Sequence, residues 1–222
     1  MTEPFRIIPG HPDSGVIIHV PHASRAIPAD IRAGIVLTDE ELERELDAMT
    51  DAFTDVIAER VADLADVRPW LFVNQRSRLV VDPERFPDGR EEMTSVGMGA
   101  VYTRTSGGSV LRDPADDEIS GLVVRYFDPY AAGFTDLVDE RLATVGHVTI
   151  VDLHSFPKDA LPYESCTATD PDRRSASGPT PRLSWSTPPA THSRTSKWAR
   201  TRRSPVATCR PPTTARGATS RR

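Results

Sequence analysis

The stretch His147–Pro157, HVTIVDLHSFP, decides the fold. Its segment Val148–Val151 is entirely β-branched, and this composition favours a buried strand. The strand then runs directly into Asp152, His154 and Ser155, which are polar or ionisable. Ligands of open α/β sheets bind outside the carboxyl ends of the strands. A strand that ends in an acid and a histidine therefore predicts a functional edge of the sheet.

The segments that surround this stretch alternate between strand and helix patterns. We expect further strands at 16–20, 70–73, 79–81 and 100–105, and helices over 38–64 and 116–144. In the first of these helices, apolar side chains recur every three or four residues, and Thr38 with Glu41 forms a capping-box pattern. The alternation predicts an α/β fold with a mostly parallel sheet.

The overall composition sets limits on the class of protein. A chain of 222 residues is long enough for an α/β domain with a real core. It begins without the apolar segment of a secretion signal and contains no apolar run near the length of a membrane span. Cys166 and Cys209 are too few for a disulfide framework. We therefore expect a cytoplasmic protein with no membrane segment.

Residues 165–222 differ in composition from the rest of the chain. They carry 12 Lys and Arg against 2 Asp and Glu, whereas the whole chain has a net charge of −5. They are rich in Ser, Thr and Pro and almost lack large apolar residues, which predicts disorder. A basic tail can be a flexible arm or a nucleic-acid contact. Its lack of interleaved aromatic residues argues against nucleic acid.

A slip of the reading frame is the explanation that we favour for this tail. The chain holds 25 Arg against 2 Lys, which suggests GC-rich codons, and GC-rich DNA read out of frame tends to spell Arg, Pro, Ser, Thr and Ala. In that case Cys166, His192 and Cys209 have no functional role. We expect residues 1–164 to form part of an α/β domain and residues 165–222 to form a frameshifted, disordered tail.

Two short motifs provide candidate metal ligands. His22 follows the first predicted strand in HVPHAS, whereas His19 lies inside the apolar run and fits a packed structural histidine. Alternation places Asp152 and His154 on one side of their strand. Two histidines at one sheet edge, joined by a carboxylate, form the pattern of a catalytic zinc site, although iron or cobalt would also fit. The alternative is an Asp–His hydrogen bond that merely ends the strand.

The third ligand is expected on the helix predicted over 38–64. Asp47 and Asp51 lie one turn apart on one face of that helix, beside its apolar stripe. Asp152 is expected to orient the imidazole of His154 from behind, as carboxylates commonly do at metal sites.

The stretch Asn74–Asp88, NQRSRLVVDPERFPD, is rich in arginine. Arg78 and Arg85, together with Asn74, could clamp a substrate carboxylate through paired hydrogen bonds. The alternative is ordinary surface ion pairing of the arginines with Asp82 and Glu84.

These motifs resemble one known family in their order and spacing. HVPHAS, ELDAMTDAFTDVI, NQRSRLVVDPERFP and VDLHSFP, with GMGAVYTRTSGG, are similar to segments of the N-formylglutamate amidohydrolase family over residues 14–164. The resemblance implies a three-layer α/β/α fold related to zinc carboxypeptidases and aspartoacylase. It also implies metal-dependent hydrolysis of N-formyl-L-glutamate or a similar N-acyl amino acid.

The resemblance assigns roles to individual residues. His22, Asp47 and His154 match the ligands of zinc or another divalent metal, with Asp51 the less favoured acid. Arg78 and Arg85, with Asn74 beside them, match residues that contact the substrate carboxylates. The resemblance also implies that His22 and His154 are catalytic residues.

Two departures from the family pattern stand out. This chain has Asp82-Pro83-Glu84-Arg85 where the family often has Asp-Leu-Asn-Arg. The family's later segments, with the glutamate that serves as general base, are not found, so the base is unknown. An aspartoacylase-like acylase and a non-catalytic remnant with a nucleic-acid-binding tail stay open as alternatives. No oligomeric state follows from the sequence.

Overall fold

A computed structural model of the chain describes residues 3–156 and the main chain of residues 182–186. Five strands form a single sheet in the order β1-β3-β2-β4-β5. They are β1 (Phe5–Ile8), β2 (Val16–Val20), β3 (Trp70–Asn74), β4 (Thr149–His154) and β5 (Arg182–Ser186). The three central strands run parallel, and the two edge strands pair antiparallel with them. The predicted α/β fold with a mostly parallel sheet is confirmed.

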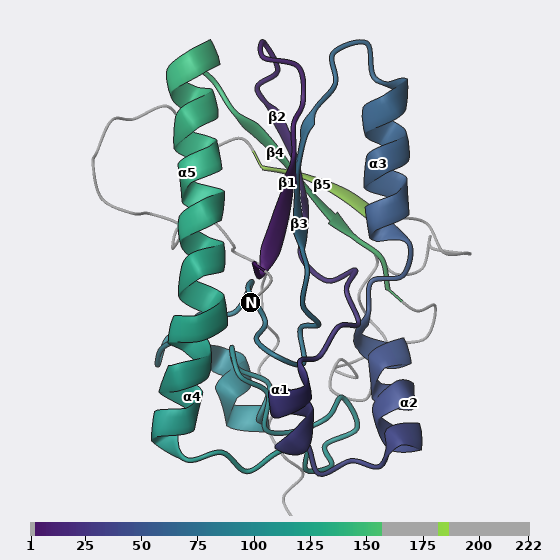
Figure 1. Cartoon of the computed structure of the whole chain (residues 1–222), viewed down its shortest axis with the longest axis vertical. Helices are drawn as coiled ribbons and strands as arrows, with labels where there is room; N and C mark the ends of the chain where they lie inside the picture. Colours follow the sequence, from purple (N-terminus) through teal and green to yellow (C-terminus); the bar gives the residue numbers. More distant parts are fainter. Residues whose placement is uncertain (1–2, 157–181, 187–222) are drawn as a thin grey trace, which may run out of the picture.

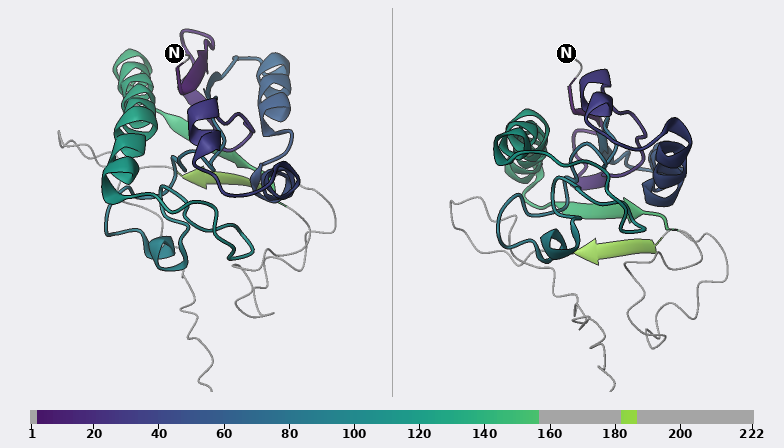
Figure 2. Two further views of the ribbon diagram at one scale, coloured as in Figure 1. Left: turned by 60° about the horizontal axis from the view of Figure 1, so that its bottom comes forward. Right: turned by 90° about the horizontal axis from the view of Figure 1, so that it is seen from below.

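Helices cover both faces of the sheet. In Figure 1, α5 (Asp128–Val145) lies on one side and α3 (Thr54–Leu64) on the other, which gives three α/β/α layers. The other helical segments gather beyond one end of the sheet. They are α1 (Ala29–Ala33), α2 (Asp39–Met49), the 3₁₀ turn η1 (Glu92–Val96), α4 (Asp116–Leu122) and the π-helical turn η2 (Val123–Phe127). Figure 2 shows β4 and β5 side by side with opposite directions.

Two apolar clusters hold these layers together. One packs Ile18, Val20, Leu71, Val73, Val151 and Leu153 against Ala58 and Ala62 of α3. The other packs Ile17 and Phe72 against Tyr130, Phe134 and Leu137 of α5. Because central parallel strands are buried on both faces, they read as continuous apolar runs in the sequence. This is why the runs at 16–20, 70–73 and 148–151 predicted strands correctly.

The single long helix predicted over 38–64 is wrong. The capping box of Thr38 and Glu41 is present and begins α2, but α2 ends at Met49 and α3 begins at Thr54. Between them Phe53 adopts a left-handed backbone conformation, with φ of 65°. A continuous helix cannot contain such a residue, so the chain turns at this point.

Other predicted elements need smaller corrections. Residues 79–81 are buried, as are most of 100–105 except exposed Arg104, but neither stretch forms a strand, apart from isolated bridges at Tyr102 and Arg104. The helical region 116–144 is confirmed as α4, η2 and α5, and Pro129 lies just after the π-helical turn η2. None of the helices within residues 3–156 combines the length and apolar character needed to cross a bilayer.

The tail lies mostly outside the described residues. Within 165–222 the structure describes only β5, whose backbone pairs with β4, and we did not expect a strand there. Cys166, His192 and Cys209 fall outside the described part, so the frame slip and the boundary at residue 164 stay predictions.

Candidate metal site

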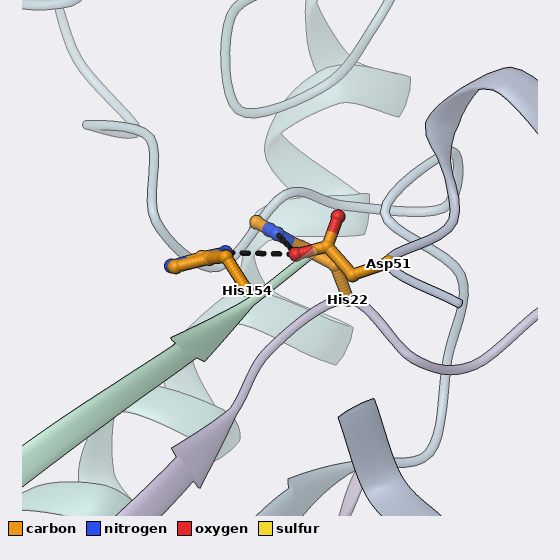
Figure 3. A group of neighbouring side chains, drawn as sticks. All are labelled: His22, Asp51 and His154. Carbon is orange, nitrogen blue, oxygen red and sulfur yellow. Dashed lines mark hydrogen bonds and ion pairs between the residues drawn. The ribbon is translucent and has the colours of Figure 1, made fainter. Parts of the chain in front are cut away.

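Two neighbouring parallel strands bring His22 and His154 together. His19 of β2 and Asp152 of β4 are paired across the sheet, so the two strands end at nearly the same level. His154 is the last residue of β4, and His22 follows the end of β2 by two residues. Their rings lie 5.4 Å apart between centroids, and Figure 3 shows both at the tips of the strands.

Asp51 completes the group from the turn between α2 and α3. Its backbone N–H donates to the carbonyl oxygen of His22 at 3.0 Å, which fixes the turn against the loop after β2. Its Oδ2 lies 2.8 Å from Nδ1 of His154 and 3.7 Å from Nδ1 of His22. One nitrogen or oxygen of each residue lies within 4.8 Å of the others, so the three side chains can reach a single cation.

The structure does not place Asp47 with the histidines. Its side chain is 73% exposed on α2, and its carboxylate pairs with Arg25 at 2.7 Å. The expectation that Asp47 joins the site is therefore corrected in favour of Asp51. The cause is the break after Met49, because only the residues beyond the end of α2 turn toward the sheet edge.

His22 carries the clearest sign of a missing partner. The residue is buried, and its Nε2 lies 3.0 Å from Oδ1 of Asp82. Among the described residues its Nδ1 has no hydrogen-bond partner, and it faces Oδ2 of Asp51 and Oε2 of Glu84, at 3.7 and 3.6 Å. Buried polar atoms are nearly always satisfied. A ring nitrogen left open beside carboxylates, with the other nitrogen held by a carboxylate, is typical of a metal-binding histidine.

His154 shows a similar arrangement. Its Nδ1 bonds Asp51, while its Nε2 lies 3.4 Å from both Oδ1 of Asp152 and Oε2 of Glu84. The structure thus places Asp152 behind the ring, on the side away from Asp51, where an orienting carboxylate was expected.

The electrostatic environment of Asp51 and His154 favours a positive charge between the surrounding carboxylates. Burial acts to raise the pKa of Asp51, but contacts with His154 and His22 outweigh it and lower the pKa to about 2. Burial acts to lower the pKa of His154, but its contacts with Asp152, Asp51 and Glu84 raise the pKa to about 12. The protein without metal therefore holds a proton among these carboxylates, and a divalent cation could replace it.

Arg78 lies behind His22 rather than at the surface. Its Nη2 donates to Oδ2 of Asp82 at 2.7 Å, and the hydroxyl of Tyr102 donates to the same oxygen at 2.6 Å. Asp82 is fully buried, and charged Arg78 and His22 hold the pKa of its carboxyl well below the usual range despite that burial. Arg78 therefore pairs with Asp82, as one of the two alternatives had it, but the pair is internal rather than at the surface; a contact of Arg78 with substrate stays a prediction.

Asn74 also has internal partners. Its Nδ2 donates to the carbonyl oxygen of Pro21 at 2.8 Å, and its Oδ1 accepts from the backbone N–H of Arg76 at 3.0 Å. Asn74 therefore supports the loop that carries His22. Arg85 is the most exposed of the three expected clamp residues; it lies 3.7 Å from Asp82 and 3.5 Å from Glu91.

Sequence reasoning did not identify Asp82 and Glu84 as site residues. The only sign was the departure at Asp82-Pro83-Glu84-Arg85, where the structure now places a carboxylate beside both histidines. Glu84, Asp152 and His19 form a second group with metal-ligating side chains. Both ring nitrogens of His19 already have hydrogen-bond partners, in Asp152 and Tyr130, so the structural role expected for His19 is confirmed.

Comparisons with known proteins identify the family and the fold. The family model of N-formylglutamate amidohydrolase matches residues 14–206. A crystal structure of N-formylglutamate amidohydrolase from Ralstonia eutropha JMP134 superimposes with a TM-score of 0.58 at 22% identity, covering 71% of this chain and 59% of that one. A gene product of Agrobacterium tumefaciens gives a TM-score of 0.56 at 18% identity, covering 72% and 59%.

These structural likenesses concern the fold, and the chain spans 59% of the length of each of the two solved structures. No curated protein sequence matches the chain. The family match nevertheless takes in most of the chain, including every residue of the candidate metal site. The chain belongs to the N-formylglutamate amidohydrolase family.

Proposed function

We propose that this chain hydrolyses the amide bond of N-formyl-L-glutamate or a similar N-acyl amino acid, using a divalent cation held by His22, Asp51 and His154. The observation that carries the proposal is the buried Nδ1 of His22, which lacks a hydrogen-bond partner within the described part of the chain and faces Asp51 and Glu84. Family membership supports the same chemistry and the choice of substrate class.

Zinc is the metal that we favour. Imidazole nitrogen and carboxylate oxygen are its usual catalytic ligands, and a site with three protein ligands keeps a position open. When bound, the cation would polarise the scissile carbonyl and lower the pKa of a water molecule. The same donors accept iron or cobalt, so metal content has to be measured.

The side chains of this chain would supply the proton transfer and the substrate contacts. Glu84 has a carboxylate oxygen within 3.6 Å of the imidazoles of both His22 and His154. We therefore assign to Glu84 the role of general base, which accepts a proton from the attacking water. The water oxygen joins the carbonyl carbon, the C–N bond breaks, and the same proton passes to the leaving amine. Arg85, which is partly exposed, would hold the substrate carboxylate.

Metal content and formate release test the proposal together. The purified full-length chain is expected to hold one zinc ion per molecule by mass spectrometry and to release formate from N-formyl-L-glutamate. His22→Ala should lose both, whereas His11→Ala, a matched change of an exposed histidine, should keep both.

A panel of substrates separates the alternatives. Preference for N-acetyl or longer acyl amino acids would indicate an aspartoacylase-like acylase. A wild-type protein that is folded and binds no divalent metal would reject the site.

A further inference from the structure

A buried line of two hydrogen bonds and one ion-pair contact leads away from the candidate metal site. The hydroxyl of Tyr130, on α5, lies 2.5 Å from Nε2 of His19. Nδ1 of His19, on β2, lies 2.8 Å from Oδ1 of Asp152. That same oxygen of Asp152, on β4, lies 3.4 Å from Nε2 of His154. Three elements of the fold thus connect through one line of polar contacts, of which the proposed chemistry uses only His154.

The direction of each hydrogen bond follows from the groups involved. An ionised carboxylate only accepts, so Nδ1 of His19 carries the proton that is donated to Asp152. Nε2 of the neutral ring is then an acceptor, and the hydroxyl of Tyr130 donates to it. Every polar atom of the His19 ring is satisfied.

The surroundings of His19 keep this line of contacts rigid. His19 and Tyr130 are both buried, and the His19 ring stacks on Phe134 with centroids 4.6 Å apart. Tyr130 also packs edge-on against Phe72, at 5.0 Å. Hydrogen bonds in such an apolar setting are strong, and losing one partner leaves an expensive unsatisfied group.

The His22 side of the site has the same construction. There Asp82 holds Nε2 of His22, and Arg78 and the hydroxyl of Tyr102 hold Asp82. On each side a histidine is backed by an aspartate, and the aspartate is backed by deeper groups that include a buried tyrosine hydroxyl. The parallel indicates that the groups behind Asp152 act on His154 as those behind Asp82 act on His22.

We propose that His19 and Tyr130 are positioning residues of the metal site. They hold Asp152 in place, and Asp152 in turn keeps the His154 ring turned so that Nδ1 faces Asp51. The inference rests on the proposed metal-dependent function, but it concerns ring orientation, which exists without the metal.

Tyr130→Phe in the full-length chain is the first test, because it removes one hydroxyl and keeps the ring. The matched control is Tyr126→Phe, since the hydroxyl of Tyr126 is buried without a partner among the described residues. Zinc affinity would be measured by competition with a chelating dye. Removing groups that orient ligands typically weakens metal binding tenfold to 100-fold; Tyr130 lies two steps further out, behind His19 and Asp152, so we expect roughly a threefold to tenfold loss for Tyr130→Phe and none for Tyr126→Phe.

His19 provides a test by rescue. The amide nitrogen of asparagine can take the place of Nδ1 and donate to Asp152, whereas alanine cannot. His19→Ala should therefore weaken zinc binding more than His19→Asn. Equal losses in the two variants would show that His19 acts through packing alone and would overturn the proposal.

Imidazole NMR of the metal-free protein makes the result independent of the metal. The ring nitrogen signals of His154 are expected to change in Tyr130→Phe and to stay the same in Tyr126→Phe. Unchanged His154 signals in Tyr130→Phe, or zinc affinities equal in both variants, would overturn the positioning role. A wild-type protein that fails to bind zinc while its His154 signals still depend on Tyr130 would instead reject the proposed function and keep the positioning role.

Discussion

Asp82→Asn is the substitution that tests the buried network most directly. The new side chain has nearly the same shape, but it lacks the negative charge that Arg78, His22 and the hydroxyl of Tyr102 share. Asp82 is completely buried, so no water can replace the lost interactions. The variant therefore leaves the guanidinium of Arg78 buried without its counter-ion.

The size of the effect follows from that burial. Removing one partner of a buried ion pair typically costs about 3–5 kcal/mol in the free energy of unfolding. In a domain of this length each kcal/mol lowers Tm by about 2–4 °C, so a drop of roughly 6–20 °C is expected. Because Asp82 also holds Nε2 of His22, zinc affinity should fall about tenfold to 100-fold.

The assay is thermal unfolding of the metal-free protein, followed by zinc titration at a temperature where the variant is folded. Asp88→Asn is the matched control, since Asp88 makes its ion pair with Arg90 on the surface. The control should leave Tm and zinc affinity unchanged. If Asp82→Asn were as stable as the control and bound zinc as tightly, the network would have neither of the roles given to it here.

Four further predictions concern the site and its turn. His154→Ala should abolish stoichiometric zinc in folded protein, measured by mass spectrometry, and metal retained by this variant would remove the site. Asp51→Asn should lose zinc in the same measurement while Asp47→Asn keeps it, and the opposite pattern would restore Asp47 as the ligand. The carboxylates around His154 raise its pKa to about 12, so at neutral pH a cation must displace a proton. Zinc affinity should therefore rise about tenfold per pH unit, with proton release visible by calorimetry in buffers of different ionisation enthalpy; affinity independent of pH would contradict this. Phe53→Asn should raise Tm by about 2–4 °C, because the left-handed conformation costs a bulky residue about 1–2 kcal/mol and the 74% exposed ring loses little burial; a lower Tm would show that the ring makes a necessary contact.

Local patterns predicted the elements that local forces determine. The apolar runs that became β2, β3 and β4 are buried on both faces, and the capping box at Thr38 begins α2 as expected. The two histidines were predicted as a pair, because parallel strands deliver their last residues to one edge.

The third ligand could not be predicted from the periodicity of the helix. Nothing in the residues from Thr50 to Phe53 marks a break, and phenylalanine disfavours the left-handed conformation that it adopts there. The break depends on distant contacts, above all the hydrogen bond from Asp51 to the backbone of His22. Helical periodicity assumes a straight helix and so left Asp47 and Asp51 as candidates on one face, and the family resemblance then favoured Asp47.

The arginine motif left two interpretations open for a related reason. Sequence spacing cannot tell whether a guanidinium points outward to a substrate or inward to a buried carboxylate. The answer for Arg78 depends on Asp82 and Tyr102, which meet only when the loops beyond the sheet have packed.

The pairing of His19 with Asp152 has a consequence for how the chain folds. These two residues are direct partners in the β2–β4 register, and their side chains bond on the α5 face of the sheet. A slip of β4 by one residue would turn Leu153 toward that face and leave the His19 ring unpaired in an apolar layer. Strands that are apolar on both faces can pair in several alignments. Loss of the hydrogen bond between His19 and Asp152 destabilises the incorrect ones. The hydrogen bond between His19 and Asp152, which we assign to ring orientation, thus also favours the correct alignment of β2 and β4 during folding.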